Sequence, residues 1–136
     1  MRGMINLLGP LFTRAFKPGA SEVKAARLVS VDDSTTRATI ATPASGKKIR
    51  IIALQVWTDS TTAAVVEVYF DTGTNITSNA GNEIAEPRLD LDDFSHFDMV
   101  WPDGGGPVGG ADEVVSLRTT ANITVAVRII IHYREE

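Results

Sequence analysis

The sequence contains no cysteine, no excess of positive charge and no long apolar run. The absence of cysteine excludes disulfide bonds, thiolate zinc sites, iron–sulfur clusters and a cysteine nucleophile. Without cysteine, the redox compartment of the protein cannot be inferred from the sequence. No apolar segment approaches the ~20 residues that a membrane-spanning helix needs. The 13 Lys and Arg against 17 Asp and Glu give a net charge of −4. A nucleic-acid binder needs a basic surface, so neither nucleic acid nor membrane is an expected partner.

The residues that are abundant favour β-structure. Val, Ile and Thr are frequent, and side chains branched at the β-carbon pack well on pleated sheets but lose rotamer freedom in helices. The 11 Gly and 6 Pro fall mostly between apolar runs, where turns are expected. A chain of 136 residues is long enough for one domain with its own core. The composition therefore predicts a single all-β domain.

The first residues predict an extended N-terminal arm over 1–20, followed by one β-sandwich domain over 21–136. A signal peptide is disfavoured because Gly9–Pro10 breaks the apolar stretch and Thr13–Arg14 occupies the place of a small-residue cleavage site. The polar residues of the arm do not form the sustained face of an amphipathic membrane anchor. Its apolar side chains are expected to lie on this domain or on a neighbouring subunit: Met4, Ile5, Leu7, Leu8, Leu11, Phe12 and Phe16.

The apolar segments predict about seven or eight antiparallel strands in a β-sandwich or a jelly-roll-like barrel. Segment 123–133 alternates most cleanly. Its expected core face is Ile123, Val125, Val127, Ile129, Ile131 and Tyr133. Turns at 59–62 and 120–122 predict two hairpins, each joining the strands on either side of the turn.

Segment 47–58 has apolar residues on both faces, which is typical of a central strand. Strict alternation predicts that one face carries Ile52, Leu54 and Val56. The opposite face is then expected to carry Ile49, Ile51, Ala53 and Trp57.

Acidic residues around His96 raise the possibility of a cation site. The neighbours are Asp90, Asp92, Asp93 and Asp98, but their spacing matches no calcium loop. Segment 71–75 resembles a fragment of such a loop without its distal glutamate. His132 lies beside Arg134 and is expected at the surface. No metal or cofactor is therefore predicted.

No catalytic pattern is found. The sequence has no G-x-S-x-G nucleophile elbow. The glycines at 104–106 and 109–110 are not followed by a helix start, so they predict a flexible loop and not a phosphate cradle. The expectation is a protein without enzymatic activity and without catalytic residues.

Four aromatic residues leave two interpretations open. Exposed aromatic rings on a β-sandwich stack on sugars, and they also anchor protein interfaces. Phe94 and Phe97 are expected mainly in the core, and Trp57 remains a candidate for either role. Trp101, beside a proline and the glycine run, is expected to act as an anchor on a partner.

The middle of the chain resembles small β proteins of tailed bacteriophages. The resemblance covers about residues 30–133 and is carried by Thr35–Ala41, by Ala44–Ile52 with its Gly-Lys-Lys entry into a β-branched strand, and by a last strand ending in Tyr133. This style is common in head-decoration (cement) and head-fibre proteins.

The resemblance implies a structural virion protein on the outer surface of a capsid, assembled in the host cytoplasm. Its expected partner is the major capsid protein, and its expected form is a homotrimer. Such a protein stiffens the shell and needs no active site. Two alternatives stay open: a glycan- or receptor-binding module of a head fibre or tail, and a small β-barrel enzyme built around residues 90–98.

Overall fold

A computed structural model describes residues 22–30, 36–60, 62–74, 78–79, 81–89, 95–102, 104–123 and 126–136. The predicted arm, including all seven of its apolar side chains, lies outside the described residues, as does Phe94. The described residues form nine strands and no helix, and all strand pairs are antiparallel. The strands are β1 Lys24–Ser30, β2 Ala38–Ala41, β3 Ile49–Thr58, β4 Ala64–Asp71, β5 Glu83–Ala85, β6 Arg88–Leu89, β7 Ser95–Val100, β8 Val114–Thr119 and β9 Val127–Glu135.

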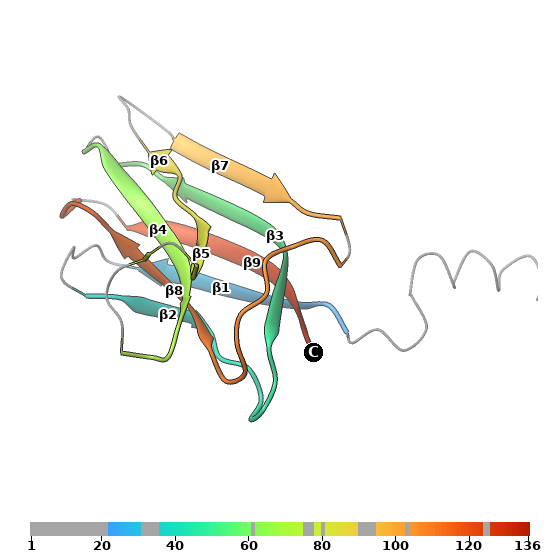
Figure 1. The fold of residues 1–136 in the computed structure, drawn as a ribbon. Coiled ribbons are helices and arrows are strands. Elements are labelled where there is room, and N and C mark those ends of the chain that lie inside the picture. Colours follow the sequence, from blue (N-terminus) through green and yellow to red (C-terminus); the bar gives the residue numbers. More distant parts are fainter. Residues whose placement is uncertain are drawn as a thin grey trace, which may run out of the picture.

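The strands form two sheets that pack as a sandwich (Figure 1). One sheet has four strands in the order β1-β9-β3-β7. The other has the order β2-β8-β4-β5, with β6 also paired to β4. If β5 and β6 together count as one edge strand, this is the strand order of a jelly roll. The prediction of an all-β sandwich is confirmed, with nine strands among the described residues where about seven or eight were expected.

Both predicted hairpins were wrong. β3 and β4 follow each other in the chain but lie in different sheets, and so do β8 and β9. A short polar turn between two apolar strands is compatible with a hairpin and also with a connection that crosses from one sheet to the other. Only long-range pairing, such as β3 with β9 and β4 with β8, distinguishes the two.

A bulge in β3 overturns the predicted faces of that strand. The pairing with β9 shifts between Ile51 and Ala53, so Ile52 is the extra residue. A bulge inserts one residue and reverses the alternation beyond it. Ile49 and Ile51 therefore lie in the core together with Leu54 and Val56, and all four are fully buried. Ile52 is only partly buried, and Trp57 lies on the outer face.

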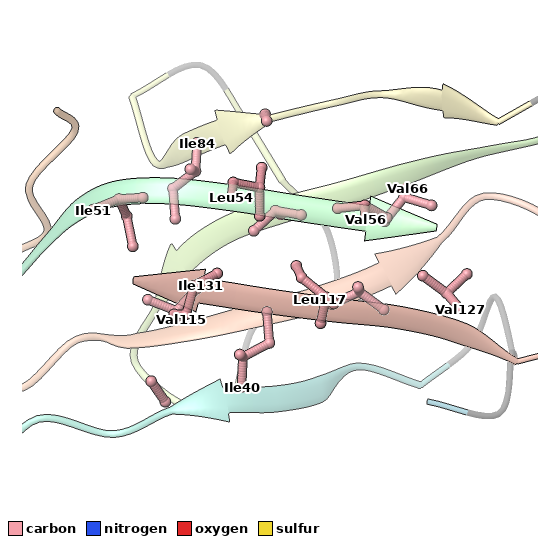
Figure 2. Packing of buried hydrophobic residues seen from close by; sticks show 14 of the residues in the cluster. Ile40, Ile51, Leu54, Val56, Val66, Ile84, Val115, Leu117, Val127 and Ile131 are labelled. Atoms are coloured by element: carbon pink, nitrogen blue, oxygen red, sulfur yellow. The ribbon is translucent and has the colours of Figure 1, made fainter. Parts of the chain in front are cut away.

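The core fills the space between the sheets (Figure 2). β9 contributes four residues of the predicted row: Val127, Ile129 and Ile131 are fully buried, and Tyr133 nearly so. Ile123 is buried before the strand begins, and Val125 lies outside the described residues. The facing sheet supplies buried apolar residues from β4 and β8, among them Val66, Val68, Val115 and Leu117. Burial of such side chains is worth about 1.5–3 kcal/mol each before the entropic cost of ordering the chain.

The glycine-rich segment is not the flexible loop that was predicted, because backbone hydrogen bonds fasten it along β3. The amide of Ile51 donates to the carbonyl of Pro107 at 2.9 Å, and the amide of Gly109 donates to the carbonyl of Ile49 at 3.0 Å. At the start of the segment, the Trp101 amide donates to the carbonyl of Ile52 at 2.8 Å. The segment thus takes up the edge of β3 that lies beyond the end of β7.

We expect Gly106→Ala to lower the free energy of unfolding by about 2 kcal/mol. A β-carbon at this position would lie 1.8 Å from the carbonyl oxygen of Ile51, so the segment must move away from β3. Gly105→Ala is the control, because its β-carbon would come no closer than 3.3 Å to the Pro102 carbonyl oxygen. Urea denaturation measures both variants. Equal stabilities of the two variants would show that the segment is not fastened at Gly106.

Candidate functional site

The outer face of the four-stranded sheet brings polar and aromatic side chains from all four strands into two rows. One row runs Arg27, Ile130, Gln55 and Asp98 across β1, β9, β3 and β7. The neighbouring row places Trp57 between Arg128 and His96. We call these seven residues the Trp57 face. No single segment of the sequence contains them, so only the strand order assembles this surface.

Trp57 separates two hollows on this face. The first, of about 250 Å³, is lined by Trp57, Gln55, His96 and Asp98, with Val56 at its base. The second, of about 380 Å³, is lined by Trp57, Arg27, Arg128 and Ile130. Trp57 itself is partly buried, so its ring is held in place while part of it remains accessible. The indole lies between two hollows with polar side chains on their rims, Gln55 and Asp98 on one side and two arginines on the other.

The charges on the Trp57 face are unevenly compensated. Arg128 donates to the Asp59 carboxylate at 3.2 Å. Nε2 of His96 lies 4.0 Å from the carboxylate of Asp98. Arg27 is exposed and has no ion pair among the residues that the structure describes. Among the described residues, the hollow lined by the two arginines therefore carries a net positive charge, although the whole chain carries a charge of −4.

The other aromatic candidates lie elsewhere. Trp101 and Phe97 are partly buried and pack against the core. The partner-binding role predicted for Trp101 is not tested by this placement, but the mobile loop on which it was expected is not present. The sequence pattern favoured Trp101 over Trp57 as the partner-binding residue because a proline and glycines surround Trp101. The bulge in β3, which turns Trp57 outward, left no signal in the sequence pattern.

The predicted acidic cluster is only partly described. His96 and Asp98 lie side by side on β7, whereas Asp90, Asp92 and Asp93 lie outside the described residues. Within the described ranges, no three His, Asp or Glu side chains are grouped as a metal site would require.

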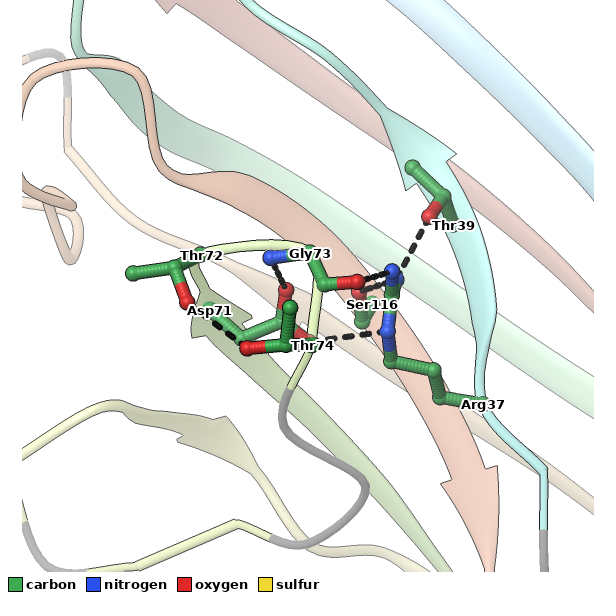
Figure 3. Close-up of polar contacts among 7 residues, drawn as sticks. All are labelled: Arg37, Thr39, Asp71, Thr72, Gly73, Thr74 and Ser116. Carbon is green, nitrogen blue, oxygen red and sulfur yellow. Dashed lines mark hydrogen bonds and ion pairs between the residues drawn. The ribbon is translucent and has the colours of Figure 1, made fainter.

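A second polar cluster lies on the outer side of the five-stranded sheet (Figure 3). Arg37, which directly precedes β2, links that strand to β8 and β4. Its guanidinium donates to Thr39 Oγ1 at 2.7 Å and to Ser116 Oγ at 3.0 Å. Its Nε lies 3.6 Å from Oδ2 of Asp71. It also donates to the carbonyl oxygen of Gly73. Asp71 is fully buried, and its Oδ1 accepts the Gly73 amide at 2.5 Å. In the segment that resembled a calcium loop, a guanidinium group therefore occupies the position beside the aspartate.

Tyr69 belongs to the same side of the sheet and was not recognised from the sequence. It points away from Val68 and Phe70 but is completely buried. This burial, together with the negative charge of Asp71, raises the pKa of Tyr69 to about 12. Arg118, which pairs with Glu67 at 2.6 Å, and Arg37 partly oppose the effect.

The raised pKa of Tyr69 predicts a loss of stability at high pH. Because the folded state holds the phenolic proton more tightly than the unfolded chain, this contribution is complete below pH 10 and disappears as the pH rises through about 12. The difference between the pKa of Tyr69 in the folded and in the unfolded chain corresponds to roughly 3 kcal/mol of unfolding free energy. Thermal unfolding of the chain and of Tyr69→Phe between pH 8 and 12 measures it. We expect a shallower alkaline decline in the variant, and parallel curves would contradict the assignment.

Comparison with known proteins finds no matching family model and no matching curated protein. No helix long and apolar enough to cross a membrane occurs within the part of the chain that the structure describes.

Proposed function

We propose that this chain is a structural virion protein that decorates the outside of a bacteriophage capsid. Support comes from the sequence resemblance over about residues 30–133 and from the jelly-roll strand order, a fold that viral capsid proteins use among many others. The capsid shell is the proposed partner, and a homotrimer is the proposed assembly.

The observation that carries the proposal is a group of exposed valines at one end of the four-stranded sheet. Val100 is 75% exposed, and Val23 and Val108 are 44% and 43% exposed. Val100 pairs with Ala53, and Val108 pairs with Arg50, so both flank the same end of β3. Val23 immediately precedes β1, whose Lys24 pairs with Tyr133 at that end.

These are the large apolar side chains that are exposed among the described residues, and they gather where the chain enters the fold. The described chain begins at Glu22, next to Val23 at this same end. An apolar arm and exposed apolar side chains at one end of a domain are what a contact with a protein surface requires. We therefore assign this end as the capsid-facing side.

The test is co-sedimentation of the purified chain with empty capsids assembled from the major capsid protein encoded in the same genome. We expect saturable binding at a fixed copy number per shell. Deleting residues 1–17 should abolish binding while circular dichroism shows an intact β-domain. Val100→Asp should weaken binding by roughly tenfold or more, the loss expected when a charge enters an apolar contact.

Thr72→Asp is the matched control, because it adds the same charge at an exposed position in the turn directly after β4 of the other sheet. Its binding should equal that of the unchanged chain. Failure of the full chain to bind shells would overturn the proposed function. If capsid binding survives the deletion of residues 1–17, the arm is not needed for the proposed function.

A further inference from the structure

We propose that the Trp57 face binds a short oligosaccharide that carries an acidic sugar. This inference does not rest on the capsid role, because it concerns other side chains and a different class of ligand. It rests on the placement of one aromatic ring between two hollows of different charge.

The ring supplies the platform for a sugar. One side of a pyranose presents mainly C–H groups and packs on an aromatic ring, while its hydroxyl groups need hydrogen-bonding partners around that ring. Trp57 is partly buried and lies opposite Arg128 on β9 and His96 on β7, so a ligand that stacks on it orders less side-chain freedom than on a fully exposed ring. A rigid aromatic ring surrounded by polar groups suits a sugar better than a purely apolar partner.

The first hollow has the groups to bind neutral hydroxyls. Gln55 offers a carbonyl oxygen and an amide, and Asp98 offers two acceptor oxygens, directly opposite each other on β3 and β7. His96 completes the rim. This combination of donors and acceptors matches hydroxyl groups, which both donate and accept.

The second hollow has the charge to bind a carboxylate. Arg27 and Arg128 both line it, and only Arg128 has an acidic partner among the described residues. A carboxylate of the ligand can accept charge-assisted hydrogen bonds from the Arg27 guanidinium. Four strands at the usual spacing span about 14 Å, so a ligand crossing from Arg27 to Asp98 must contain more than one ring.

The experiment is a glycan array of acidic and neutral oligosaccharides, followed by titration of the full chain with 3′-sialyllactose, trigalacturonate, lactose and maltotriose. Trp101→Phe leaves Trp57 as the single tryptophan, so its fluorescence reports directly on the site. We expect binding of at least one acidic probe class with a change in Trp57 fluorescence, and weaker or no binding of neutral probes.

Arg27→Glu should reduce the affinity for the acidic probe at least tenfold, the loss expected for a charge-assisted hydrogen bond. Gln55→Ala should also weaken binding, and both positions are exposed, so the fold should survive. Lys47→Glu makes the same charge change at an exposed position just before β3 begins, roughly 25 Å away, and should bind as the unchanged chain does.

Absence of binding across all acidic glycans, binding of neutral sugars alone, or unchanged affinity in Arg27→Glu would each overturn the proposal. Sedimentation velocity under the same conditions identifies one rival occupant. If Arg27→Glu alters self-association while no glycan binds, the face joins copies of this chain and the sugar site is refuted.

Discussion

Replacing Arg37 with leucine is expected to lower the free energy of unfolding by about 3 kcal/mol. The Asp71 side chain is fully buried, and its Oδ2 has no hydrogen-bond partner among the described residues. The Arg37 guanidinium, whose side chain is 18% exposed, is the counter-charge beside it. Removing Arg37 leaves a buried carboxylate without compensation and also releases Thr39 and Ser116 from their shared donor.

A double-mutant cycle separates the ion pair from the packing around it. Combining Arg37→Leu with Asp71→Asn removes the uncompensated charge, so the double variant should be more stable than the sum of the single effects predicts. Arg128→Leu is the matched control, because its pair with Asp59 is exposed and should contribute no more than about 0.5 kcal/mol. Strict additivity, or equal effects of the two arginine substitutions, would show that solvent already compensates Asp71.

Replacing Leu54 with alanine is expected to cost about 3 kcal/mol, because the side chain is completely buried between the two sheets. The neighbouring variant Ile52→Ala removes a residue of the same size from the bulge, where the side chain is only partly buried. It should cost about 1 kcal/mol.

Chemical denaturation of both variants therefore tests the bulge as well as the core. Strict alternation along β3 places Ile52 and Leu54 on one face and predicts similar losses. The bulge predicts a large loss for Leu54→Ala and a small one for Ile52→Ala. Equal losses would contradict the described register, in which Ile52 is the extra residue of the bulge.

The alternation of β9 followed directly from the sequence. In β9 the residues at alternate positions from Val127 to Tyr133 are buried, because an uninterrupted strand presents every second side chain to the same face. Val66, Val68 and Phe70 in β4 follow the same rule. The burial of Tyr69 and Asp71 on the other side of β4 did not follow from the sequence, since it depends on long-range packing on the outer side of the sheet.

The composition and periodicity of this sequence determined an all-β sandwich, because β-branched residues and period-two patterns are local properties. Tertiary structure decided which strands pair, since short turns permit both hairpins and crossings between sheets. It also decided which tryptophan faces outward, because a single extra residue at Ile52 reverses the alternation. The Trp57 face exists only through that register, which joins four strands distant in sequence.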